Sequence, residues 1–301
     1  MGDSSYLLGT HTEELERLRF QHELWLPAAR AAWQRAGLAP GMRVLDVGAG
    51  PGFAAMDLAR IVGPTGRVLG LELSDAYVAA GQTMARHEQL PQLELRQHHL
   101  LRDPWPAEGF DRAWCRWVAM FLADLDPLLA GLERSLRLGG QLVLHEYVHW
   151  DTFGIHPGGR AIARFGQACQ RSFREAGGDP DVNRRLPSLL AARGWRIDAV
   201  QPLPVAGDSR SMAGQWLQRF VEVYGVRLQE LGLWSSSDAV DAREEIAAAA
   251  KDPGSFWVGP TLLELRASRA ACLDTGARPE ETSNQLDIGS AQQHPGIELG
   301  Q

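Results

Sequence analysis

The segment VLDVGAGPGF, residues 44–53, starts with branched apolar residues and runs through one acid into three closely spaced glycines. Branched apolar residues favour a buried strand, whereas glycines allow a tight turn in which the backbone approaches a ligand closely. A glycine-rich turn between a strand and a helix is typical of proteins that bind nucleotides. The segment therefore predicts a nucleotide-like ligand at the end of the first strand of an α/β fold.

The spacing of these glycines argues against a dinucleotide. The dinucleotide pattern is G-x-G-x-x-G, whereas this turn reads G-x-G-x-G and has Phe53 where the third glycine would stand. Asp46 precedes the first glycine by two residues, where its carboxylate would repel a pyrophosphate and attract an ammonium group. The turn therefore favours a zwitterionic or cationic ligand, and it disfavours a nicotinamide-dependent oxidoreductase.

A second acid follows the next apolar run, VLGLELS. Glu72 stands 20 residues after Gly52, at the expected carboxyl end of the second strand. A carboxylate at that place can accept hydrogen bonds from both hydroxyls of a ribose. The ligand is therefore expected to combine a ribose with a positive charge.

The chain has 301 residues and alternates strand-like and helical segments as far as Tyr147. This alternation predicts βαβ units with right-handed crossovers, which build a doubly wound, mostly parallel sheet. Beyond that point, residues 157–177 and 210–232 indicate helices that are too long to be simple crossovers. We expect them to be insertions, within about 148–255, that form a helical cap with an acceptor pocket beneath it.

The expected domain organisation has three parts. Residues 1–38 form an N-terminal helical lid, and residues 39–269 form the main domain together with the cap. Residues 270–301 are polar and lack periodicity, so they are expected to form a disordered tail. The stretch at 255–268 is expected to supply the last strand of the sheet.

Composition bounds the partners and the compartment. The formal net charge is −7 and the pI about 5.7, so no basic surface for nucleic acid is expected. The three cysteines are far apart, which fits neither a metal site nor a disulfide framework and predicts a reducing, cytoplasmic environment. No apolar run reaches the roughly 18 residues of a membrane helix, and no signal peptide is recognised. The oligomeric state is left open.

These features resemble a known family. Five residues resemble the first two motifs of class I S-adenosylmethionine-dependent methyltransferases: Asp46, Gly48, Gly50, Gly52 and Glu72. The stretch at 93–147 is similar to the third to fifth strands of ubiquinone/menaquinone-type and small-molecule methyltransferases. The resemblance covers residues 40–147 and implies a seven-stranded, mostly parallel, doubly wound sheet with S-adenosyl-L-methionine as cofactor.

The resemblance also implies a set of cofactor-binding residues: Tyr6, Gln21, Asp46, Gly48, Gly50, Gly52, Glu72, Leu73, His99, Leu100 and Arg116. His99 stands where the family often has an Asp that accepts a hydrogen bond from the adenine amino group, and the imidazole is expected to take that role. Arg116 either pairs with a carboxylate of the cofactor or holds a neighbouring loop. Tyr6 and Gln21 either close over the cofactor or are solvated surface residues.

The end of the fifth strand is rich in polar residues, and ligands of open α/β sheets lie beyond the carboxyl ends of the strands. His145 and His149 are the candidate catalytic residues, each as a general base for an acceptor that must lose a proton. The alternative for His145 is a structural role.

The expected function is a small-molecule methyltransferase (EC 2.1.1), which transfers a methyl group by in-line displacement to an oxygen, nitrogen or carbon atom of the acceptor. Two alternatives stay open, namely a methyltransferase acting on a macromolecule and a protein that binds the cofactor without methyl transfer.

Overall fold

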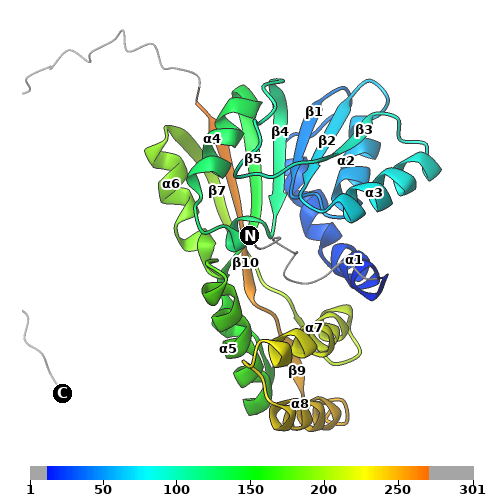
Figure 1. Ribbon diagram of the computed structural model, residues 1–301, viewed down its shortest axis with the longest axis vertical. Coiled ribbons are helices and arrows are strands. Elements are labelled where there is room, and N and C mark those ends of the chain that lie inside the picture. Colours follow the sequence, from blue (N-terminus) through cyan, green and yellow to red (C-terminus); the bar gives the residue numbers. More distant parts are fainter. Residues whose placement is uncertain (1–11, 271–301) are drawn as a thin grey trace, which may run out of the picture. The chain divides into compact units, whose positions relative to one another are not determined.

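The computed structural model describes residues 12–270 (Figure 1). Within this range, seven strands form the central sheet: β1 (Arg43–Val47), β2 (Arg67–Glu72), β3 (Leu93–Gln97), β4 (Phe110–Arg116), β5 (Leu136–His149), β7 (Trp195–Leu203) and β10 (Thr261–Arg269). Their order across the sheet is β3-β2-β1-β4-β5-β10-β7, and β10 is the one strand that runs opposite to the other six. The predicted doubly wound, mostly parallel seven-stranded sheet is therefore confirmed.

Helices connect the strands and cover both faces of the sheet. They are α1 (Thr12–Arg35), α2 (Phe53–Val62), α3 (Asp75–His87), α4 (Asp126–Ser135), α5 (Arg160–Glu175), α6 (Leu186–Ala192), α7 (Met212–Glu230) and α8 (Ser236–Ala249), with short 3₁₀ turns η1 (Ala119–Phe121), η2 (Trp150–Thr152) and η3 (Val182–Arg184). Ser74 caps α3 by accepting a hydrogen bond from the Tyr77 backbone N–H, because its hydroxyl replaces a missing intrahelical acceptor.

Two hydrophobic clusters lie on the two faces of the sheet, as strand alternation requires. Val44 of β1 packs with α1 and α2 on one face, whereas Leu45 and Val47 belong to the larger cluster on the other face. On β5, Val143 and Leu144 divide between the clusters in the same way. The same alternation determines which polar side chains of β5 can reach a ligand.

The segment after β5 builds a second structural layer. Helices α5, α7 and α8 pack on one another, and α5 and α7 also pack on a small sheet of β6 (Gly154–His156), β9 (Phe256–Val258) and β8 (Ala206–Gly207). Figure 1 shows these helices beyond the end of the central sheet at which β5 stops. They therefore stand over the carboxyl ends of the parallel strands, where ligands of such sheets bind.

The last strand differs from its prediction. Residues 256–269 form two strands in two different sheets, because Pro260 lies between them and has no N–H for a continuous ladder. No helix in the described part of the chain combines the length and the apolar character that a bilayer crossing needs. The predicted tail lies outside the described residues except for Ala270, and Tyr6 lies outside them as well.

Candidate functional site

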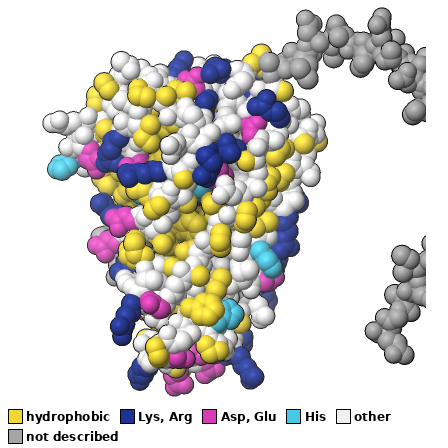
Figure 2. Space-filling model, turned by 180° about the vertical axis from the view of Figure 1, so that it is seen from behind, with side chains coloured by type: hydrophobic (Ala, Val, Ile, Leu, Met, Phe, Trp, Pro, Cys, Tyr) yellow, Lys and Arg dark blue, Asp and Glu magenta, His cyan; other side chains and the backbone are white. Residues whose placement is uncertain are grey.

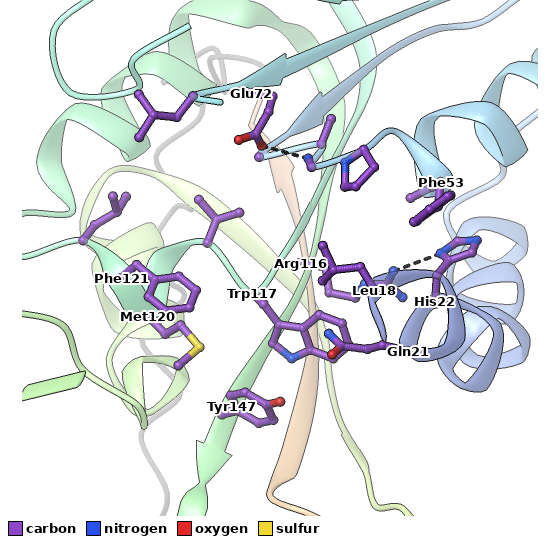
Figure 3. Close-up of a pocket in the computed structure, with 18 of the residues that line it drawn as sticks. Leu18, Gln21, His22, Phe53, Glu72, Arg116, Trp117, Met120, Phe121 and Tyr147 are labelled. Carbon is purple, nitrogen blue, oxygen red and sulfur yellow. Dashed lines mark hydrogen bonds between the residues drawn. The ribbon is translucent and has the colours of Figure 1, made fainter. Parts of the chain in front are cut away.

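A pocket of about 540 Å³ opens at the carboxyl ends of the parallel strands, between the sheet, α1 and α7 (Figure 3). We divide it into two halves by their side chains. The glycine half is lined by Asp46, Gly48, Gly50, Glu72, Leu73, His99, Leu100 and Arg116. The aromatic half is lined by Trp117, Phe121, Tyr147, Trp150, Phe153, Phe173, Trp216 and Phe220. The structure thus brings predicted site residues and cap aromatics to one cavity.

The glycine turn after β1 forms one wall of the glycine half. Gly50 has a φ of +55°, and a Cβ built on it would meet nothing within 4 Å, so a side chain there would enter the open pocket. Gly52 is different: it does not line the pocket, and a Cβ on it would lie 2.9 Å from the Leu95 side chain. Gly52 therefore permits close packing of α2 on the sheet, and it stands outside the pocket lining that contains Gly48 and Gly50.

Glu72 holds the glycine turn from the neighbouring strand end. Its Oε2 accepts a hydrogen bond from the Gly50 backbone N–H at 2.8 Å, and its Oε1 accepts one from the Ser74 N–H at 2.9 Å. Burial raises the pKa of Glu72, and the backbone hydrogen bonds oppose that shift. Each carboxylate oxygen has a further lone pair, so Glu72 can still accept hydroxyl donors from a ligand.

Asp46 and Arg116 leave buried polar atoms without partners in this half. Asp46 is 2% exposed, and its Oδ2 makes no hydrogen bond within residues 12–270. The Nη1 of Arg116 is equally buried and equally unpaired there. Burial raises the pKa of Asp46 to about 7 against the opposing charge of Arg116, and burial lowers the pKa of Arg116 to about 10. A carboxylate and a guanidinium, each with one unpaired buried atom, therefore line one cavity, which suits a zwitterion.

His22, on α1, holds Arg116 in place. The Nη2 of Arg116 lies 3.0 Å from His22 Nδ1, and His22 Nε2 lies 2.9 Å from Asp57 Oδ2 on α2. Because arginine only donates, Nδ1 accepts and Nε2 carries the proton that Asp57 accepts. Burial lowers the pKa of His22, which keeps the ring neutral as this arrangement requires. The sequence alone gave no indication of this role for His22, since its partners come from other elements.

His99 differs from its expected role. Its Nδ1 accepts a hydrogen bond from the Leu101 backbone N–H at 3.2 Å, so in the neutral ring the proton lies on Nε2. Nε2 is then a donor and cannot accept from an adenine amino group. Of the predicted cofactor-binding residues, nine line the pocket: Gln21, Asp46, Gly48, Gly50, Glu72, Leu73, His99, Leu100 and Arg116.

The aromatic half is organised around Trp117, which directly follows β4 and has an unusual φ of +55°. Its ring stacks on Tyr147 at 6.0 Å between centroids, and the Arg116 guanidinium lies 4.7 Å from its centroid. Buried Glu146 fixes the turn, because its Oε1 accepts from the N–H groups of Val118 at 2.7 Å and Ala119 at 2.9 Å. These bonds offset the roughly 1–3 kcal/mol that such a backbone conformation costs.

Neither predicted catalytic histidine lines the pocket. His145, on β5, is fully buried, and it lies 3.5 Å from Glu264 Oε2 on β10 and 4.7 Å from the Trp114 ring on β4. It shares the sheet face of Val143, so strand alternation turns it away from the large cluster beneath the cap. His149 is exposed, and its Nδ1 lies 3.4 Å from Arg184 Nη2. Both assignments as general bases are therefore corrected.

Comparison with known proteins places this geometry. Residues 38–173 match the family described as a methyltransferase domain. The chain is 37% identical over 168 residues to an uncharacterized 37.1 kDa protein in a transposon of Streptomyces fradiae, covering 54% of this chain and 46% of that protein. It is 28% identical over 127 residues to a ubiquinone/menaquinone biosynthesis C-methyltransferase of Shewanella halifaxensis, covering 42% and 49%. The chain thus spans about half the length of these curated relatives.

Solved structures share the fold at low sequence identity. A putative methyltransferase from Bacillus halodurans has a TM-score of 0.55 at 17% identity, over 80% of this chain and 98% of that one. The geranyl diphosphate C-methyltransferase of Streptomyces coelicolor has a TM-score of 0.53 at 18% identity, over 89% and 90%. Fold, glycine turn and family match agree: over residues 38–173, the chain carries a domain of the class I S-adenosylmethionine-dependent methyltransferase family.

Proposed function

We propose that this protein transfers a methyl group from S-adenosylmethionine to a small organic acceptor. The observation that carries the proposal is the pair of unpaired buried groups, Asp46 Oδ2 and Arg116 Nη1, beside the open side of Gly50. The methionine end of S-adenosylmethionine carries an ammonium and a carboxylate, which would satisfy these two groups in turn. A dinucleotide would leave Asp46 facing a like charge.

The other residues of the glycine half fit the rest of the cofactor. Glu72 has lone pairs left for ribose hydroxyls, and its hold on Gly50 keeps the turn open for the ligand. The Leu100 backbone and the His99 ring stand at the neighbouring strand end, where we assign the adenine. In this position the His99 Nε2–H would donate to an adenine ring nitrogen.

The bound cofactor supplies a methyl group already activated by a sulfonium, so the chain mainly has to orient the acceptor and exclude water. Alignment of this kind contributes about 7–11 kcal/mol to lowering a barrier. We propose α1 as the lid and α5, α7 and α8 as the cap that enclose the reaction. Burial raises the pKa of Tyr147, so the phenol stays protonated and is unsuited to act as a base. An acceptor that is nucleophilic without a protein base fits this pocket best.

The acceptor is proposed to be a small molecule because the pocket continues into the aromatic half. Figure 2 shows acidic and basic side chains interspersed on the face seen from behind, around a central hydrophobic area. That face offers no continuous basic track for a nucleic acid. The cytoplasmic location belongs to the same proposal and rests on the three widely spaced cysteines of the sequence.

Two measurements test the proposed function. Calorimetric titration with S-adenosylhomocysteine should show one site per chain, with Asp46→Asn weakening it. A panel of apolar acceptors, read by mass spectrometry of S-adenosylhomocysteine release, should then reveal turnover. A folded protein that fails to bind S-adenosylhomocysteine would refute the proposal.

A further inference from the structure

The Gln21 side chain presents its amide nitrogen to the pocket. Its Oε1 accepts hydrogen bonds from Arg17 Nη1 at 2.7 Å and from Trp216 Nε1 at 3.0 Å. Arginine and tryptophan side chains only donate, so the atom that they share must be the oxygen. The amide nitrogen, with its two hydrogens, makes no hydrogen bond to other residues of the described range, and Gln21 lines the cavity (Figure 3).

Tyr147 supplies a second donor to the same cavity. Its hydroxyl also lacks a hydrogen-bond partner within residues 12–270, and Figure 3 shows its ring beside Trp117. A series of ring contacts links the two donors. Trp25, one helical turn after Gln21, meets Trp117 edge-on at 5.9 Å, and Trp117 stacks on Tyr147. Gln21 and Tyr147 both line the pocket, and Trp117 of its aromatic half lies between the two contacts.

The positive charge of Arg17 is neutralised at the edge of the aromatic half. Arg17 is 4% exposed and lines the pocket, but Glu14 accepts two hydrogen bonds from it, at 2.6 and 2.7 Å. The remaining walls are rings and aliphatic groups from the cap and from the turn after β4. Burying a charged or strongly polar ligand against such walls costs desolvation free energy, because rings and aliphatic groups offer no hydrogen bond or ion pair to offset it.

We propose that the Gln21 amide nitrogen and the Tyr147 hydroxyl form a donor pair that binds one carbonyl or hydroxyl oxygen of a predominantly apolar acceptor. That this ligand is the methyl acceptor rests on the proposed function, whereas the existence of the binding subsite does not. The pair orients the ligand in the aromatic half, whose other residues select a ligand by its shape alone. It also replaces the predicted role of Gln21 in cofactor binding, since Gln21 is anchored to α7 beneath the cap.

Two ligands with one carbon skeleton isolate the oxygen. 1-Tetralone carries a carbonyl and tetralin lacks it, so the ratio of their Kd values reports the donor pair. Ligand-observed NMR titration of the wild-type chain, with and without S-adenosylhomocysteine, should give 1-tetralone about tenfold tighter binding, as expected for one to two net hydrogen bonds.

The variants separate binding from structure. Gln21→Glu keeps an oxygen for Arg17 and Trp216 but removes the amide donor, and Tyr147→Phe removes only a hydroxyl. Each should reduce the preference for 1-tetralone to about threefold or less while near-ultraviolet circular dichroism stays unchanged. Tyr224→Phe is the matched control, because Tyr224 packs on Phe220 at 5.3 Å but its hydroxyl pairs with Ser172 and it does not line the pocket.

Several results would overturn the donor pair. These are equal binding of the two ligands by the wild-type chain, an unchanged preference in both variants, an equal loss in Tyr224→Phe, or no binding of either ligand. S-adenosylhomocysteine titration of the same samples tests the proposed function separately. If the chain does not bind S-adenosylhomocysteine but Gln21→Glu still reduces the preference for 1-tetralone, the subsite is supported and the proposed function is refuted.

Discussion

The two halves of the pocket recognise ligands by different physical means. The glycine half leaves one buried atom of each of two charged groups unpaired, Asp46 Oδ2 and Arg116 Nη1, so it selects a ligand of complementary charge. At the aromatic half, the Arg17 guanidinium is paired with Glu14, and the rest of the lining presents rings and two neutral donors. Charge therefore restricts the ligand of the glycine half narrowly, whereas shape and one polar contact restrict the ligand of the aromatic half less strictly.

The largest expected effect is in the glycine half. Gly50→Val places a branched side chain into open pocket space at a φ of +55°, where side chains other than that of glycine are strained. S-adenosylhomocysteine affinity should fall more than roughly a hundredfold, since the ligand and the side chain compete for one volume. Calorimetry measures the loss, and 1-tetralone binding should persist. Equal damage to both ligands would show that the halves are not separable.

Glu72→Gln should weaken cofactor binding about tenfold, which corresponds to the loss of one charge-assisted hydrogen bond. The amide keeps one acceptor oxygen, so one of the two backbone N–H groups now held by Glu72 loses its partner. The same titration reads the change, with circular dichroism as the control for folding. An unaltered Kd would remove Glu72 from the cofactor site.

The cofactor affinity should depend on pH through Asp46. Burial raises the pKa of Asp46 to about 7, so acidification protonates the carboxyl and removes its attraction for an ammonium group. Lowering the pH from 7.5 to 6 should weaken S-adenosylhomocysteine binding roughly eightfold, because affinity follows the ionised fraction. In Asp46→Asn the profile should be flatter. A wild-type profile that rises toward low pH would contradict the assignment.

The smallest expected effect belongs to the aromatic half. Trp216→Phe keeps a ring but removes the N–H that Gln21 Oε1 accepts, which frees the amide to rotate. The affinity for 1-tetralone should fall about threefold, within the range of one neutral hydrogen bond. S-adenosylhomocysteine binding should stay within error of wild type. A larger loss for the cofactor than for 1-tetralone would reverse the assignment of the two halves.

The glycine half was predictable from the sequence because its residues follow strands at fixed distances. Asp46, Gly50 and Glu72 each stand at or just beyond a strand end, so the topology alone brings them together. The same rule failed for His145, since one step along β5 decides which sheet face a side chain reaches. A polar residue near a strand end is therefore a weaker signal than one within a turn motif.

The aromatic half could not be read in the same way. Gln21 meets Trp216 across 195 residues, and even beside the glycine half the His22–Asp57 contact that holds Arg116 spans 35 residues. Such contacts depend on how α1 packs against α7 and α2, which no local pattern encodes. The density of Trp and Phe beyond residue 148 predicted an acceptor pocket in general terms, but it gave no indication of the donors that face it.

The central claim is that Asp46 and Arg116 bind the amino-acid end of the cofactor. Titration of the wild-type chain with S-adenosylhomocysteine and with 5′-methylthioadenosine tests it most directly, because the second ligand keeps adenine and ribose and lacks the zwitterion. The account predicts that S-adenosylhomocysteine binds about a hundredfold more tightly, as two charge-assisted hydrogen bonds require, and that Asp46→Asn narrows the gap. Equal affinities for the two ligands in the wild-type chain would contradict it.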